Sequence, residues 1–187
     1  MKFKQWFLEN DQRVFRIDPQ KIDDFSKNLK TYYFMGPESG SVEDTSKPPE
    51  WAKGQQGEFK TGLFTGGYKN ILSYLIPRHI PWVIEHTTPK KTLYYNKEDQ
   101  QEIEGYSPYI SSFDPKGFTK LDMSGQGEYF SENPPKPIKQ AQIKNPLRIL
   151  ASQFNLVPLR NAAELQNKFR EILSQGRSAD AEGLEFN

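Results

Sequence analysis

The sequence predicts an α+β fold in which twisted, mostly antiparallel sheets are flanked by short helices. Aromatic residues make up 13% of the 187 residues, and 13 glycines and 14 prolines divide the chain into short segments. The mean hydropathy is −0.81, so the aromatic side chains must supply much of the core. Short aromatic or alternating segments, typical of strands, occur between segments that have the apolar spacing of helices.

Composition excludes several classes of function. The chain has no cysteine, which rules out disulfides, thiolate metal sites and a cysteine nucleophile. The 25 basic and 24 acidic residues give a net charge of +1, so nucleic-acid binding through a basic surface is not favoured. The apolar segments are all far shorter than the ~20 residues of a membrane span, and residues 1–10 lack the apolar core of a secretory signal. We therefore expect a cytoplasmic protein with no membrane contact.

The expected elements follow from apolar periodicity and from helix-capping residues. Helices are expected at residues 1–9 and 68–75, from Asp18-Pro19 to Leu29, at 97–104 after Asn96, from Asn145-Pro146 to residue 153, and at 161–174. Strands are expected at residues 13–17, 31–35, 61–65, 82–86, 92–95, 108–113, 118–121, 128–131 and 154–159. Residues 133–137 are too rich in proline to pair within a sheet.

We expect three parts along the chain. Residues 1–30 form an appendage of helix, strand and helix, residues 31–174 form a single α+β domain, and residues 175–187 form a flexible tail. The first helix has one aromatic face, which packs on the domain's own core or docks on a partner. Residues 36–60 are rich in Gly, Pro, Ser and charge, and form either a functional lid or a solvated loop in which Trp51 is the main anchor.

Established metal-binding, phosphate-binding and nucleophile motifs are absent or incomplete in the sequence. Two histidines, His79 and His86, are too few for a zinc site without carboxylates from elsewhere, so no metal is expected. The segment TGGYKN at residues 65–70 places paired glycines before a helix, where backbone amides can face an anion, but it lacks the established phosphate-loop patterns. A GxSxG nucleophile motif is absent from the chain.

One arrangement of segments stands out. An aromatic strand TYYFMG is followed by a long loop, then by GLFTGGYKNILSYL, and late in the chain by GEYFSENPPKPIKQAQI. Over residues 31–157 this order resembles ADP-ribosyltransferase-like domains. The segment YLIPRHIPWV, with its Pro-Arg-x-x-Pro step, is also similar to small uncharacterised bacterial proteins.

The first resemblance implies a site that binds NAD and transfers ADP-ribose to an acceptor. Glu128 would be the catalytic carboxylate, hydrogen-bonding a hydroxyl of the nicotinamide ribose and stabilising the oxocarbenium-like transition state. The residues implied in cofactor binding are Tyr33, Gly62, Phe64, Thr65, Tyr68, Tyr74 and Arg78. Of these, Tyr74 or Tyr68 would stack on the nicotinamide ring.

The sequence departs from the family at Phe34, where the family has His or Arg, because a phenyl ring cannot hydrogen-bond a ribose hydroxyl. Arg78, His79 or His86 are possible substitutes, and a degenerate site is an open alternative. Ordinary structural roles compete with the functional ones: a solvated strand end for Glu128, core packing for Tyr74, and a surface ion pair for Arg78. The alternative function is a non-enzymatic interaction protein that docks through its aromatic N-terminal helix or the 36–60 loop.

Overall fold

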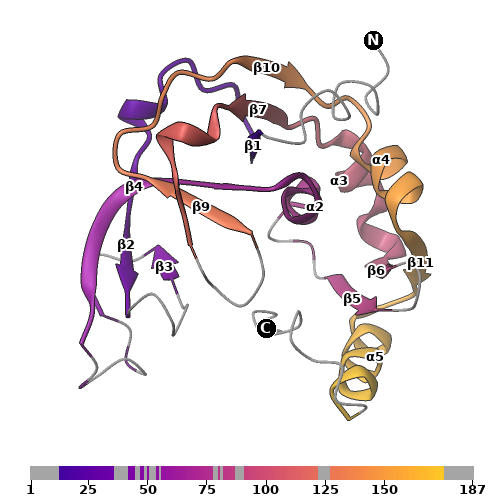
Figure 1. The fold of residues 1–187 in the computed structure, drawn as a ribbon. Coiled ribbons are helices and arrows are strands. Elements are labelled where there is room, and N and C mark those ends of the chain that lie inside the picture. The colour runs from indigo at the N-terminus through magenta and orange to yellow at the C-terminus, as the bar shows by residue number, and fades with distance from the viewer. Residues whose placement is uncertain are drawn as a thin grey trace. The chain divides into compact units, whose positions relative to one another are not determined.

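The computed structural model shows a chain divided into two compact units (Figure 1). Unit 1 takes its residues from 1–73 and 109–142, and unit 2 from 74–108 and 143–187. The structure describes residues 13–35, 42–44, 47, 48, 50, 54, 56–77, 80, 82–86, 91–121 and 127–174. The strands at residues 14–18 and 30–34 pair with later strands of unit 1. The division into residues 1–30, 31–174 and 175–187 expected from the sequence stays a prediction.

Unit 1 is built on a sheet of eight strands among the described residues, in the order β10-β7-β1-β4-β2-β3, with β9 paired to β4 and β8 paired to β9. All of its pairings are antiparallel. The strands are β1 (Val14–Asp18), β2 (Lys30–Phe34), β3 (Val42–Asp44), β4 (Glu58–Gly66), β7 (Tyr109–Phe113), β8 (Thr119–Lys120), β9 (Glu128–Ser131) and β10 (Lys139–Gln142). Short helical turns lie at η1 (Phe25–Lys27), α2 (Tyr68–Ile71), η3 (Leu72–Leu75), which runs into unit 2, and η5 (Pro115–Gly117).

One hydrophobic cluster of unit 1 lies on the face of the sheet to which Val14 and Leu63 point. Val14, Phe25, Leu63 and Phe113 are buried together, and Phe25 meets Phe113 edge-on with 5.0 Å between the ring centroids. Phe118 packs on Phe113 in the same way at 5.5 Å. The expectation that aromatic side chains supply much of the core is confirmed here, since edge-on pairs of this kind add to the stabilisation from burial.

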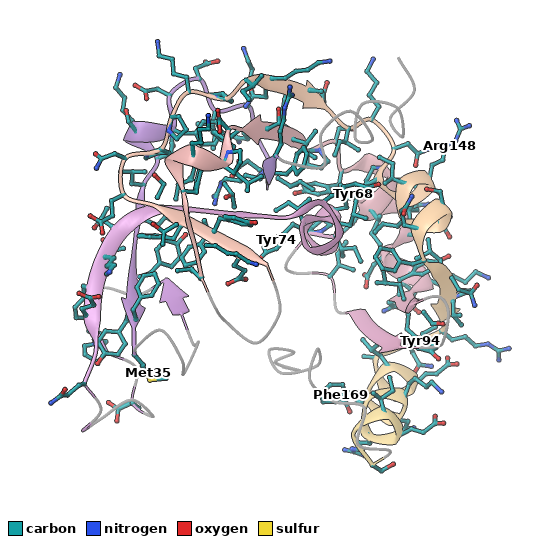
Figure 2. The ribbon with its side chains drawn as sticks, in the orientation of Figure 1. Met35, Tyr68, Tyr74, Tyr94, Arg148 and Phe169 are labelled. Carbon is teal, nitrogen blue, oxygen red and sulfur yellow. The ribbon has the colours of Figure 1, made fainter. Side chains whose placement is uncertain are left out.

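Unit 2 contains a three-stranded sheet in the order β11-β6-β5, with strands β5 (Trp82–His86), β6 (Lys91–Asn96) and β11 (Asn155–Leu159). β5 pairs with β6 in antiparallel fashion, whereas β11 runs parallel to β6. The helices of unit 2 are η4 (Lys97–Asp99), α3 (Gln100–Gly105), α4 (Pro146–Gln153) and α5 (Ala162–Ser174). α5 packs Leu165, Phe169 and Ile172 against Tyr94 and Leu159 of the sheet, as its apolar spacing predicts (Figure 2).

Two predicted helix starts in unit 2 are confirmed down to their caps. The side-chain oxygen of Asn96 accepts a hydrogen bond from the backbone amide of Glu98 at 3.1 Å. That of Asn145 accepts one from the amide of Arg148 at 3.0 Å, and Pro146 occupies the first helical turn. The α+β class and the mostly antiparallel pairing are thus what the sequence predicts.

The helix expected from Asp18 to Leu29 is wrong. β1 continues through Asp18, and only the 3-10 turn η1 forms, capped by Asp24, whose carboxylate accepts from the amide of Ser26 at 3.1 Å. Asp18 cannot act as a helix cap because its carboxylate is bound by the guanidinium of Arg16 at 2.9 Å. Within the expected 36–60 loop, β3 and the first residues of β4 are strands. The N-terminal helix and Trp51 lie outside the described residues.

Candidate active site at the β4–β9 pair

The two strands that carry the implied site are direct neighbours. β9 pairs with β4 over four residues, with Glu128 opposite Gly66 and Phe130 opposite Phe64. The amide of Gly67 donates to the carbonyl of Gly127 at 3.1 Å, and Gly127 has φ of 61°, a left-handed conformation that favours glycine. The backbone of Glu128 is therefore held by β4 and by the turn that precedes it.

The Glu128 side chain is half-buried. Burial raises the pKa of its carboxyl above the ordinary value of 4.5. Among the described residues, its carboxylate has neither a hydrogen-bond donor nor a cation as partner. Its neighbour across the strand pair, Gly66, has no side chain to cover it. Such a carboxylate can accept hydrogen bonds from a ligand and can stabilise positive charge beside it.

Four aromatic side chains of β2, β4 and β9 form a cluster that we call the aromatic face: Tyr32, Phe34, Phe64 and Phe130. Phe64 lies at the centre, with its ring centroid 4.5 Å from Tyr32, 6.0 Å from Phe34 and 5.0 Å from Phe130. Phe34 and Phe130 also meet at 5.1 Å. Because Glu128 precedes Phe130 by two residues in a strand, both side chains point to the same side of the sheet.

A cation lies at the Phe34 end of the aromatic face. The Lys60 ammonium is 5.6 Å from the centroid of the Phe34 ring and 2.8 Å from a carboxylate oxygen of Glu58. The side-chain hydrogen bond with Glu58 is the main cause that raises the pKa of Lys60. Lys60 and Glu58 are two residues apart in β4 and share the side of the sheet that holds Phe64. The aromatic face thus has a charged pair at one end and a carboxylate at the other.

Strand alternation separates several of the residues that the resemblance groups together. Phe64 is on the aromatic face, but Thr65 points to the other side, where it is 3% exposed. Tyr33 likewise points away from the aromatic face and is buried with its ring centroid 5.0 Å from that of Phe59. Gly62 is covered by Phe130: a Cβ atom at Gly62 would lie 2.4 Å from Cζ of that ring.

The two candidate tyrosines lie in different units. Tyr68 opens α2 in unit 1 and is half-buried, and burial raises the pKa of its phenol (Figure 2). Tyr74 belongs to unit 2, where it is 42% exposed, so the core packing considered as an alternative does not apply to it. Arg78 lies outside the described residues. Of the implied site residues, Glu128 and Phe64 therefore share one side of the β4–β9 pair, and Tyr68 begins the helix that follows β4.

A polar group that the sequence reasoning missed lies beside the same strand. Arg16 of β1 donates from Nη1 to the carbonyl of Phe64 at 3.0 Å, and from Nε to the two carboxylate oxygens of Asp18 at 2.9 and 3.1 Å. Burial raises the pKa of Asp18, and Arg16 and Lys30 oppose that rise. Opposite charges two residues apart were the available signal, because such residues share one face of a strand, but the strand expected at residues 13–17 stops before Asp18.

The described residues contain no helix long and apolar enough to cross a membrane. Nor do they bring three His, Cys, Asp or Glu side chains together as a metal site would require. Comparison with protein-family models, with curated proteins and with solved structures gave no significant match to this chain.

Proposed function

We propose that unit 1 is an ADP-ribosyltransferase-like module that binds NAD and transfers ADP-ribose to an acceptor, with Glu128 as the key carboxylate. The observation that carries the proposal is the pairing of the Glu128 strand with the GLFT strand, which leaves a half-buried carboxylate beside an aromatic face. The segment order from which the sequence resemblance is drawn needs these two strands close together, although they are 60 residues apart along the chain.

The proposed reaction exchanges one bond at ribose C1′ for another, and positive charge develops on the ribose as it proceeds. The bond between nicotinamide and ribose C1′ breaks with its electron pair leaving on nicotinamide, and an acceptor lone pair bonds to C1′ while the acceptor proton passes to solvent. A carboxylate near C1′ stabilises the positive charge that develops on the ribose. Glu128 has the chemistry for this role, because its carboxylate is ionised above its raised pKa and no described cation competes for it.

Part of the implied NAD-binding set fits this role and part does not. Phe64 has the ring needed for contact with a planar ligand and is on the same side of the sheet as Glu128. Tyr33 and Thr65 point to the opposite side, and the position over Gly62 is filled by Phe130. Phe34 lies on the aromatic face and supplies no hydrogen bond to a ribose. We therefore restrict the proposed NAD contacts in unit 1 to Glu128, Phe64 and Tyr68.

Ligand binding is the measurement that tests this proposal, because it does not require the acceptor. Thermal unfolding of the full chain is compared with and without millimolar NAD. A ligand at 100 times its dissociation constant stabilises the folded state by about 2.7 kcal/mol, which for a chain of this size raises the midpoint by roughly 5–10 °C. We expect a shift of that order for the wild type.

The matched variants are Glu128→Gln and Glu132→Gln. Both remove a carboxylate and keep the side-chain volume, but Glu132 is exposed just beyond the end of β9. The proposal requires the NAD-dependent shift to fall in Glu128→Gln and to persist in Glu132→Gln. An unshifted wild type, or equal shifts in all three proteins, would refute it.

The alternative of a protein-interaction function depends on the N-terminal helix or on residues 36–60. The helix and most of that loop lie outside the described residues, so this alternative stays a prediction. Deleting residues 1–9 and measuring the effect on partner capture would test it.

A further inference from the structure

We propose that the proline segment of unit 1, residues 133–139, is a docking site for a partner domain that binds polyproline-II peptides in an aromatic groove with acidic side chains at one end. The sequence of this segment is Asn-Pro-Pro-Lys-Pro-Ile-Lys. It joins β9 to β10, and Figure 1 shows it as the orange trace that leaves β9 and follows the margin of the sheet to β10. This inference is independent of the NAD-binding proposal.

The conformation of the segment is set by its prolines. Each proline fixes its own φ near −65°, and the residue before a proline is restricted to extended or polyproline-II conformations. Asn133, Pro134 and Lys136 each precede a proline, so residues 133–137 are all constrained toward polyproline II. Prolines also lack the amide that a sheet ladder needs, and residues 132–138 form no strand.

The segment is anchored at three points, so its shape exists before any partner arrives. Ser131 ends β9 and Lys139 begins β10, and the amide of Ile138 donates to the carbonyl of Ser112 at 2.8 Å. Midway along, the Pro135 ring occupies the space that a side chain at Gly117 would need: a Cβ atom there would lie 2.6 Å from Cδ of Pro135. A pre-ordered segment loses little conformational entropy on binding.

This anchoring decides which side chains a partner can reach. Polyproline II has three residues per turn, so Pro134 and Pro137 share one edge, while Pro135 is on a second edge that faces Gly117. Pro134 and Pro137 are partly exposed, and Lys136 and Lys139 are exposed. Ile138, next to Pro137, is 52% exposed. The contact with Gly117 is made by Pro135, and the edge that carries Pro134 and Pro137 is partly exposed.

The charge of the segment selects the partner. Residues 133–139 contain two lysines and no acidic residue, in a chain whose net charge is only +1. Aromatic-lined grooves take prolines that are three residues apart, and acidic side chains beside the groove attract the lysines. An SH3 domain with an acidic specificity pocket has this chemistry, and it is the partner class to which we commit.

The test titrates the full-length chain into an isolated, ¹⁵N-labelled SH3 domain of that type and follows its amide resonances. We expect shifts confined to the aromatic groove and its acidic end, weakening as salt screens the lysines. The double variant Pro134→Ala/Pro137→Ala should weaken binding by about tenfold or more, as should Lys136→Glu/Lys139→Glu. Pro158→Ala and Lys144→Glu, at exposed positions of unit 2, should leave the affinity unchanged.

Circular dichroism of each variant distinguishes lost contact from lost fold. Pro135→Ala should mainly lower the thermal midpoint and have only a small effect on the affinity for the SH3 domain. Its ring packs on Gly117 rather than facing the groove. No resonance shift with the chain at about 1 mM would overturn the proposal. So would binding that survives in the double proline variant while its fold is intact. Neither result bears on NAD binding, which is measured separately on Glu128.

Discussion

The ring of Phe130 lies against the backbone of Gly62, so closely that a Cβ atom at Gly62 would come within 2.4 Å of the ring and 2.5 Å of the Ser131 carbonyl oxygen. Gly62 belongs to β4 and Phe130 to β9, and both are on the side of the sheet that carries the aromatic face. The absence of a side chain at Gly62 lets Phe130 reach Phe64 and Phe34.

Gly62→Ala should therefore destabilise the protein by about 1–3 kcal/mol, because the added methyl group displaces a ring and meets a fixed carbonyl. The free energy of unfolding in urea measures the effect. Gly105→Ala is the matched control, since a Cβ atom at Gly105 meets nothing within 4 Å, and it should leave stability unchanged or slightly raised. Equal effects in the two variants would contradict the packing of Phe130 described here.

Thr65→Val should stabilise the protein by about 1 kcal/mol. The Thr65 hydroxyl is buried without a hydrogen-bond partner among the described residues, and a buried unpaired hydroxyl costs roughly 1–3 kcal/mol. Valine has the same shape and removes that cost. The control is Thr61→Val, which breaks the 2.8 Å hydrogen bond between the Thr61 and Thr31 hydroxyls at an exposed site. Its urea midpoint should not rise, and a fall in the midpoint of Thr65→Val would show that the hydroxyl has a partner.

Glu128→Gln should raise the thermal midpoint near pH 7 in the absence of ligand. The pKa of Glu128 is raised in the folded state, so folding is weakened when the half-buried carboxylate is ionised. The free energy of unfolding of the wild type increases as pH falls through the raised pKa of Glu128 toward the ordinary value of 4.5. The higher thermal midpoint of the variant relative to the wild type disappears over that interval. Midpoints of both proteins between pH 7 and 4 check this, with Glu132→Gln expected to follow the wild type throughout.

The Arg16–Asp18 pair should show strong coupling in a double-mutant cycle. Arg16→Met leaves the Asp18 carboxylate buried without its 2.9 Å partner and should cost about 3–5 kcal/mol. Asp18→Asn added to it removes the uncompensated charge, so the double variant should be less destabilised than the sum of the single changes by about 1–3 kcal/mol. Additive effects in urea would contradict a coupled pair.

Acid should partly rescue the Arg16→Met variant. Burial already raises the pKa of Asp18, and loss of Arg16 removes an influence that opposes the rise. A carboxyl group whose pKa is raised in the folded state binds a proton more tightly there than in the unfolded state. The folded state is therefore stabilised as pH falls toward the ordinary pKa of 3.8. The stability difference between Arg16→Met and wild type should therefore shrink between pH 7 and 4. A constant difference would count against a buried charge as the cause.

Asn145→Ala should cost about 1 kcal/mol, because the side chain of Asn145 accepts from the amide of Arg148 and caps α4. Lys144→Ala, one residue earlier and exposed, is the control and should be close to neutral. Urea unfolding of both variants provides the comparison. Similar losses in both would mean that the cap contributes nothing specific.

Local signals in the sequence predicted what is local in the fold. Asn96 and Asn145 cap helices because an Asn side chain reaches an amide two or three residues ahead, whatever the rest of the chain does. Asp18-Pro19 has the same pattern, yet no helix forms there. The carboxylate is held by Arg16, which is in turn fixed to the carbonyl of Phe64, 48 residues away. Capping rules do not include such a distant competitor.

The candidate site shows the same limit. The strand 128–131 was predicted with its bounds, and its pairing with β4 brings Glu128 to Gly66. Grouping Tyr33, Phe64 and Thr65 by their place in a motif ignored strand alternation. Phe64 points to one face of the sheet, and Tyr33 and Thr65 point to the other. The pairing partner of β11 was also beyond prediction, because parallel contact with β6 joins segments about 60 residues apart.

The two units share the chain in alternation: unit 1 is interrupted by residues 74–108, and unit 2 by residues 109–142. During synthesis, β1 and β4 therefore emerge well before their partners β7 and β9, and β6 waits for β11 near residue 155. Neither sheet is complete until most of the chain has left the ribosome, and no single cut separates the two units from each other. Folding of this protein should be slow and late, and its exposed strands need protection until then.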